Sequence, residues 1–392
     1  MSRIYKRTRV YKRKKRRNKR LLLSAFILVC AIIYITFPKM PSDHYEKQSQ
    51  ATEKQIKPEK KKEPKVKKEK KQSEIVTKND NKQLDDYLKN IGFSGTALIV
   101  NEGKIVTSKG YSYANRKKKV PNTPETVYYV GSSQKAIIAA SILQLEERGL
   151  LSVSDPVSTY IPDFPNGTNI TLYNLLTHTS GIKGHNEGSG YITPDNLLKD
   201  IEAQGIKNAP GKWDYKDSNY SVLAYIVTKL SGESLSTYVT NHIFKPAGMK
   251  HAGFYKTFAK QSQPSTGYKL NAFKKLYTPD MPDLSQLYGA GDIYMTAYDM
   301  YLFDKALLER KIISDQSFTK MFTPNQATYG MGFYISPGSY SNHGVMPGYN
   351  ILNSFSKTGS KYVILFSNIQ NNIKSFGVVN NRIFSILNAS ER

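Results

Sequence analysis

The chain has 392 residues, a formal net charge of +26 and a composition that is 39% hydrophobic and 11% aromatic. The charge is uneven, because residues 1–20 hold about twelve Lys/Arg and no acid, and residues 39–82 hold about fourteen Lys against eight acids. The single cysteine, Cys30, excludes disulfides and a Cys-based metal site from the remainder of the chain. Most of the charge therefore lies outside the part expected to fold.

An uncharged run, LLLSAFILVCAIIYITF, separates these two basic segments at residues 21–37. Its length is at the short end of a transmembrane span. A signal peptide is the alternative, but no small-x-small cleavage pattern follows the run. We predict a basic cytoplasmic tail over residues 1–20, a transmembrane helix over 21–38 and an extracytoplasmic remainder. Topology and lipid headgroups explain the basic tail, so no nucleic-acid partner is predicted.

Residues 51–74 are rich in Lys and Glu, contain two prolines and have almost no large apolar side chain. Such a segment cannot bury enough surface to fold. We therefore predict a disordered linker over residues 39–82 and a globular domain over 83–392.

The globular part opens with strand and helix signals. We predict a short helix in LDDYLKNIG, a hairpin in GTALIVNEGKIVTSKGYSYA that turns at Asn101-Glu102-Gly103, and a helix over about 132–148 capped by Gly149. The middle of the chain, to about residue 308, is predicted to be helical and rich in loops.

The C-terminal part returns to strands, in GYNILNSFS and KYVILFSN, and ends in a helix predicted over about 373–387. Strands at both ends with helices between them indicate an α+β domain whose sheet both chain ends complete.

Ser-x-x-Lys, a pattern of serine hydrolases, occurs at Ser132/Lys135, Ser180/Lys183, Ser317/Lys320 and Ser354/Lys357. The chemistry needs the serine at a helix start, with the lysine one turn later on the same face to take the hydroxyl proton. The serine N–H is then free to face an oxyanion. Only Ser132 fits, because VYYVGSSQKAIIAASILQLEERG runs from an extended segment into a helix. The alternative for Ser132 is a helix-capping serine followed by a surface lysine.

A second group lies in PGKWDYKDSNYSVLAYIVTKLSG, where Tyr215-Lys216-Asp217 precedes a helix that ends near Gly232. One interpretation places the Tyr215 phenol and the Asp217 carboxylate against the serine. The other is an ordinary helix cap with aromatic rings packed beneath it.

These motifs, together with LLTHTSGI, IFKPAGM, YGAGDIYMTAYDM and HGVMPGY, come in the order found in class C β-lactamase-like serine hydrolases. The resemblance covers roughly residues 83–387. Within the family the chain most resembles the PbpX and FmtA group, membrane-anchored penicillin-binding-protein-like proteins of Gram-positive envelopes. The resemblance implies a serine β-lactamase/penicillin-binding-protein-like fold, with an antiparallel sheet, flanking helices and a helical lobe.

The resemblance also implies roles. Ser132 matches the nucleophile, Lys135 its base and Tyr215 the tyrosine that shuttles protons. Asp217 stands where the family usually has asparagine, and His178 is expected to be a hydrogen-bonded structural residue. No cofactor and no metal ion is implied.

Lys357-Thr358-Gly359 matches a third family motif but lies between two strand-like runs, where Thr-Gly-Ser is typical of a hairpin turn. In the family this motif opens a strand shortly before a Pro-Gly-aromatic sequence. Alignment on MPGY places Asn342-His343-Gly344 there, with the N–H of Val345 completing the oxyanion hole. The Lys-Thr-Gly triplet is therefore predicted to be a decoy.

The substitution at Asn342 bears on the substrate. In penicillin-binding proteins the lysine and threonine of this motif help bind a substrate carboxylate. A D-alanyl ester of teichoic acid has no such carboxylate and presents an ammonium group, which Asp217 could attract. We therefore expect a membrane-anchored extracytoplasmic hydrolase of D-alanyl groups in the cell envelope, with an acyl-enzyme at Ser132. The alternatives are a low-affinity penicillin-binding protein or D,D-carboxypeptidase acting on peptidoglycan, and a non-catalytic wall-binding protein.

Overall fold

The computed structural model describes residues 78–389. The predicted tail, the predicted transmembrane helix over 21–38 and most of the predicted linker lie outside these residues and stay predictions. Within residues 78–389, no helix combines the length and the apolar character that a membrane span requires. The sheet begins with β1 (Lys78–Asn79), five residues before the predicted domain boundary.

A seven-stranded antiparallel sheet forms the centre of the described residues, in the order β1-β3-β2-β14-β13-β12-β11. The hairpin β2–β3 and the C-terminal pair β13–β14 meet in its middle, so both chain ends complete the sheet, as predicted. The strands are β2 (Gly95–Asn101), β3 (Lys104–Tyr111), β11 (Tyr334–Ile335), β12 (Ser339–Met346), β13 (Tyr349–Ser356) and β14 (Tyr362–Ser367).

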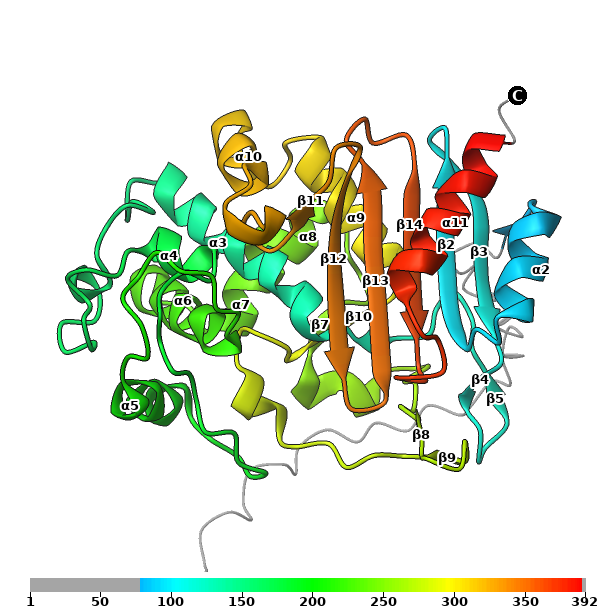
Figure 1. Cartoon of the computed structure of the whole chain (residues 1–392), viewed down its shortest axis with the longest axis horizontal. Coiled ribbons are helices and arrows are strands. Elements are labelled where there is room, and N and C mark those ends of the chain that lie inside the picture. The colour runs from blue at the N-terminus through cyan, green and yellow to red at the C-terminus, as the bar shows by residue number, and fades with distance from the viewer. Residues whose placement is uncertain (1–77, 390–392) are drawn as a thin grey trace, which may run out of the picture. The chain divides into compact units, whose positions relative to one another are not determined.

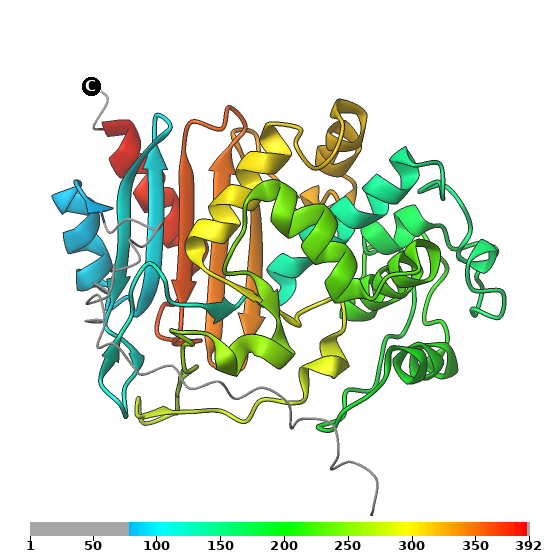
Figure 2. The ribbon, with the colours of Figure 1, turned by 180° about the vertical axis from the view of Figure 1, so that it is seen from behind.

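Helices cover both faces of β2 and β14, which explains why the sequences of these two strands are mostly apolar. Successive side chains of a strand point to opposite faces. Ala97 and Ile99 of β2 accordingly pack with α2 (Lys82–Asn90) and α11 (Phe376–Ala389), whereas Leu98 belongs to the larger core on the other side. Figure 1 shows α11 crossing the outer face over β14 and β2, and Figure 2 shows α9 (Ala297–Leu308) on the opposite face.

The middle of the chain forms a helical lobe, as predicted. Its long helix α3 (Lys135–Glu147) is wholly apolar or buried for its first eleven residues, because it passes through the larger core. The other helices are α4 (Leu172–Leu176), α5 (Pro194–Gln204), α6 (Asp217–Ser231), α7 (Leu235–Val239), α8 (Lys245–Ala247) and α10 (Asp315–Phe322). The short strands outside the central sheet are β4 (Tyr113–Asn115), β5 (Val120–Pro121), β6 (Tyr128–Tyr129), β7 (Gly253–Phe254), β8 (Lys269–Leu270), β9 (Leu276–Tyr277) and β10 (Ile293–Met295).

The last helix, α11, begins three residues later than predicted. The Ser375 hydroxyl accepts a hydrogen bond from the Val378 N–H at 3.3 Å, so the serine caps the helix and fixes its start. A capping serine is readable in the sequence, and we missed it.

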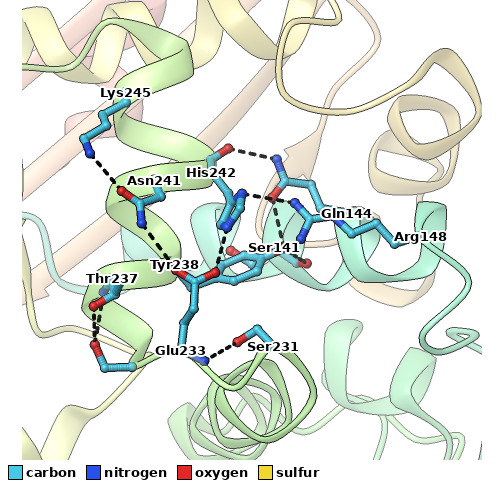
Figure 3. A network of polar contacts seen from close by, with 11 residues as sticks. Ser141, Gln144, Arg148, Ser231, Glu233, Thr237, Tyr238, Asn241, His242 and Lys245 are labelled. Atoms are coloured by element: carbon cyan, nitrogen blue, oxygen red, sulfur yellow. Dashed lines mark hydrogen bonds and ion pairs between the residues drawn. The ribbon is translucent and has the colours of Figure 1, made fainter.

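A polar network ties the end of α3 to the π-helical turn η3 (Thr240–Phe244), as Figure 3 shows. Arg148 Nη2 lies 3.1 Å from His242 Nδ1, and His242 Nε2 lies 2.8 Å from Glu233 Oε1. Because arginine can only donate, Nδ1 is the acceptor and the ring proton is on Nε2. Gln144 Nε2 also donates to the His242 carbonyl at 2.9 Å. The network fixes the end of α3 that lies opposite Ser132.

Candidate active site

Ser132 lies in a tight turn, η1 (Gly131–Gln134), which connects β6 to α3. The prediction that Ser132 starts an α-helix is wrong in the type of helix, because η1 is a 3-10 turn and the α-helix begins at Lys135. Gly131 has φ +51°, and the Ser133 N–H donates to the Val130 carbonyl at 3.2 Å, which closes the turn three residues apart. The turn presents Ser132 ahead of the helix.

Strand β12 runs directly against this turn, and Gly344 makes the close approach possible. A Cβ at Gly344 would lie 1.9 Å from the Val130 carbonyl oxygen and 3.2 Å from Ser132 N. Any side chain at this position would therefore push the strand away from the serine. The predicted Gly344 thus brings the backbone of β12 beside the Ser132 N–H.

Lys135 is fully buried and connects the serine to two other elements. Its Nζ lies 3.0 Å from Ser132 Oγ, 3.2 Å from the Ala290 carbonyl oxygen and 2.6 Å from Asp217 Oδ1. Ser132 Oγ and the Ala290 carbonyl accept hydrogen bonds from Nζ, whereas Asp217 is its ion-pair partner. An acidic partner at 2.6 Å favours the ammonium form of Lys135, which donates to Ser132 Oγ.

The charges around Lys135 support the ammonium form. Burial alone would lower the pKa of Lys135, but the Asp217 carboxylate and the Tyr215 phenol oppose burial and raise this pKa above its ordinary value. The sequence suggests that Asp217 attracts a substrate ammonium, whereas the structure gives its Oδ1 to Lys135 and leaves the side chain 38% exposed. Asp217 is thus first of all the counter-ion of Lys135.

Tyr215 precedes α6 and is held by His178. The two rings lie 4.1 Å apart, and Lys135 Nζ lies 5.1 Å from the centre of the Tyr215 ring. His178 is buried and its Nδ1 accepts from Asn219 Nδ2 at 3.0 Å and from the Lys216 N–H at 3.3 Å. Burial and the Lys135 charge hold the pKa of His178 well below its ordinary value. His178 is therefore a neutral, hydrogen-bonded support, in keeping with its predicted structural role.

A cavity of about 250 Å³ is lined by five of the eight predicted site residues; Lys135, Asp217 and Gly344 are not among its lining residues. The prediction that Asn342 opens a strand is wrong, because β12 begins at Ser339, which already pairs with Ser356 of β13. Asn342 is 3% exposed, and neither atom of its amide has a partner among residues 78–389. The cavity is lined by Ser132, Tyr215, Tyr329, Gly332, Tyr334, Asn342, His343 and Val345.

The other Ser-x-x-Lys pairs are placed differently. Ser180 is a buried loop residue whose hydroxyl donates to Asn219 Oδ1, and Ser317 lies in α10. Ser354 lies within β13.

Lys357-Thr358-Gly359 forms the turn between β13 and β14. The Gly359 N–H donates to the Ser356 carbonyl at 2.9 Å, so the predicted turn is confirmed. Thr358 lines a different cavity from Ser132.

Sequence reasoning missed one wall of the cavity and one partner of Lys135. Tyr329, Gly332 and Tyr334 form that wall, and a Cβ at Gly332 would lie 2.5 Å from Ala136 Cα. YGMGFY is a visible signal, because glycines between aromatics mark a close approach of backbone. The Ala290 carbonyl left no signal, because any residue supplies a carbonyl.

Asp292 supports the serine turn from behind. Its Oδ1 accepts from Gln134 Nε2 at 2.6 Å and from the Gly289 N–H at 3.1 Å, and Gln134 Oε1 accepts from the Ile293 N–H at 3.0 Å. Burial raises the pKa of Asp292 to about 7. The Asp292 carboxyl therefore holds Gln134, two residues after Ser132. Burial makes ionisation of Asp292 costly at this position.

No group of three or more His, Cys, Asp or Glu side chains within the described part of the chain could hold a metal ion. The arrangement of a serine hydroxyl, a buried ammonium and a phenol around one cavity suits nucleophilic chemistry on an acyl group.

Comparison with known proteins agrees with this geometry. A family model described as Beta-lactamase matches residues 81–388. The chain is 60% identical to PbpX of Bacillus subtilis over 97% of this chain and 98% of that protein. It is 33% identical to a teichoic acid D-alanine hydrolase of Staphylococcus aureus, over 65% of this chain and 66% of that protein. The crystal structure of FmtA from Staphylococcus aureus superposes with a TM-score of 0.72 at 29% identity, covering 80% of this chain and 91% of that one.

Asp292→Asn tests the buried carboxyl. The pKa of Asp292 rises from 3.8 to about 7 on folding, so the folded state binds the extra proton between these values and stability falls as pH rises through them. Asparagine keeps the Oδ1 acceptor and cannot ionise. We expect the variant to gain about 2–3 kcal/mol in unfolding free energy relative to wild type between pH 5 and pH 8, measured by urea denaturation.

Asp315→Asn is the matched control, because the side chain of Asp315 is 89% exposed. The same pH dependence for wild type and Asp292→Asn would show that Asp292 is not held in its protonated form.

Proposed function

Because the chain belongs to the beta-lactamase family, we propose that this serine hydrolase cleaves D-alanyl groups of the cell envelope through an acyl-enzyme at Ser132, with D-alanyl esters of teichoic acid as substrate. The observation that carries the proposal is the buried Lys135 side chain, whose Nζ lies 3.0 Å from Ser132 Oγ at the edge of an open cavity. The similarity to a teichoic acid D-alanine hydrolase supports the choice of substrate.

In the proposed reaction the Ser132 oxygen attacks the ester carbonyl and the polyol oxygen leaves. Tyr215 receives the Ser132 proton and passes its own proton to the leaving oxygen, so no net charge moves during acylation. The backbone N–H groups of Ser132 and Val345 receive the oxyanion. Lys135 remains an ammonium beside the serine oxygen, which replaces the base role implied by the family resemblance. Water then hydrolyses the D-alanyl enzyme by the same steps in reverse.

The charges of the cavity favour an ester over a peptide that ends in a carboxylate. Lys135 Nζ already has two hydrogen bonds and an ion pair, and Asn342 stands where the family has a lysine. No lysine or arginine is among the residues that line the cavity. A D-alanyl ester has no free carboxylate, so it needs no such cation.

A D,D-carboxypeptidase that acts on peptidoglycan stem peptides is the second candidate. The observation in its favour is the buried amide of Asn342, which could bind a peptide or a carboxylate as a neutral group. Residues 21–38 are proposed as a membrane anchor, and the basic block before them supports a cytoplasmic N-terminus.

The substrate is tested by measuring free D-alanine released from D-alanylated teichoic acid and, separately, from a D-Ala-D-Ala peptide. We expect release from the ester polymer and little from the peptide. Ser132→Ala should abolish release because the nucleophile is absent. Faster release of D-alanine from the peptide than from the polymer would contradict the proposed esterase function and support the carboxypeptidase function.

Asn342→Lys should reverse the preference. The new ammonium supplies a charge-assisted hydrogen bond to a carboxylate, worth roughly 1.5–3 kcal/mol, or about ten- to a hundredfold in affinity. We expect faster labelling by a fluorescent penicillin and slower hydrolysis of the ester, whose ammonium is repelled. Equal labelling of the wild type and the variant, both shown to be folded by their thermal midpoints, would remove Asn342 from the account of specificity.

Asp217→Asn tests the charge of Lys135. Without the carboxylate, burial dominates and the pKa of Lys135 falls, so the lysine becomes neutral at lower pH. If the ammonium is the active form, the alkaline limb of the pH profile of kcat/KM should move down by about 1–3 pH units. A gain in activity at neutral pH would instead identify neutral Lys135 as the base.

A further inference from the structure

A second and larger cavity, of about 840 Å³, opens on the outer face of the sheet, and we call it the outer groove. It lies between α11 and the ends of β12, β13 and β14. Figure 1 shows that α11 crosses β14 and β2 on this face and leaves β12 uncovered. From the strand ends and their turn, four hydroxyl side chains line the groove: Ser339, Ser356, Thr358 and Ser360. The turn is the Lys-Thr-Gly segment that the active site does not use.

The opposite wall is a polar face of α11. Asn381, Ser385 and Asn388 are exposed and follow one another at spacings of four and three, so they project from one side of the helix. Asn380 Oδ1, on the same helix, is buried and accepts no hydrogen bond from residues 78–389. A helix face that only packs against a sheet is apolar, whereas this one offers amides and a hydroxyl to the groove beside Phe384 and Ala389.

The lining has the donors that bind phosphodiesters. Phosphate oxygens in protein complexes accept hydrogen bonds mainly from Lys and Arg, from Ser, Thr and Asn side chains, and from backbone N–H groups. No carboxylate lines the outer groove, and Lys361 is its one charged side chain. Lys361 lies 3.3 Å from Glu102, so its charge is partly balanced. A chain of alternating phosphates and polyol hydroxyls fits such a lining better than a polycation does.

Strand β12 connects the outer groove to the candidate active site. Its outer face carries Ser339, Ser341, His343 and Val345, which alternate with the buried residues of the strand. Ser339 lines the outer groove, whereas His343 and Val345 line the cavity of Ser132. Ser339 and His343 are four residue steps apart along the strand, or about 13 Å. The two cavities are therefore close enough for one extended polymer chain to reach both.

We propose that the outer groove binds the polyol-phosphate backbone of an envelope polymer and holds it while an acylated unit reaches Ser132. The identity of the acyl group rests on the proposed function, but binding of the backbone requires no catalysis. A neutral glycan strand is the competing ligand.

The experiment measures binding of a poly(glycerol phosphate) chain without D-alanine to the full-length protein at physiological salt. Ser385→Glu and Asn381→Glu each place a carboxylate in the outer groove and should weaken binding about tenfold by charge repulsion. Val378→Glu adds the same charge on the same helix, at a residue that is 67% exposed and does not line the groove. This control should leave the affinity unchanged. The basic N-terminal tail also attracts the polyanion, and its sequence is the same in every variant.

Hydrolysis of a small D-alanyl ester separates this inference from the proposed function. Ser385→Glu should hydrolyse the small ester at the wild-type rate and the polymer more slowly. Lack of hydrolysis by the wild type would remove the proposed function but leave the binding result standing. Equal affinity of all variants for the polymer would contradict the proposal that the outer groove binds it. A groove variant that loses affinity for a soluble glycan strand and keeps it for the polymer would overturn the choice of ligand.

Discussion

The site depends on one ion pair, between the buried Lys135 ammonium and Asp217. An ammonium without partners in this interior would be strongly destabilising, so the two hydrogen bonds and the ion pair of Nζ are a condition for the fold as well as for the chemistry. These contacts also fix the position of Lys135 relative to the serine, because Nζ, which is paired with Asp217, lies 3.0 Å from Ser132 Oγ. A charged lysine can stabilise a serine oxygen, whereas it cannot accept a proton. In the proposed reaction, proton transfer therefore falls to Tyr215.

The rest of the architecture brings backbone and side chains to this pair. Gly344 lets β12 lie against the serine turn, and Gln134, held by Asp292, fixes the turn from behind. His178 stacks on Tyr215 and stays neutral, so it adds no competing charge beside Lys135. Strand β12 then serves two cavities, because its edge borders Ser132 and its outer face leads to the outer groove. One strand thus connects the proposed chemistry with the proposed recognition of a polymer.

The strands, helices and turns that depend on a local sequence pattern could be predicted from the sequence. The apolar runs of β2 and β14, the helix after Tyr215-Lys216-Asp217 and the Lys-Thr-Gly turn all follow from periodicity and turn chemistry. The 3-10 form of the Ser132 turn, the Ala290 carbonyl and the Asp217–Lys135 pairing did not, because each depends on residues far apart in the chain. Asp217 shows the difference most clearly: its departure from the family pattern was visible, but its partner was visible only in three dimensions.

The protonation state of Lys135 is the most direct test of the account. The side-chain NMR signals of labelled lysines identify Lys135 as the signal that Lys135→Arg loses, and a pH titration then gives its charge. The account predicts an ammonium at neutral pH, with a pKa above the ordinary lysine value in the wild type and a lower one in Asp217→Asn. A neutral Lys135 amine in the wild type at pH 7 would contradict it.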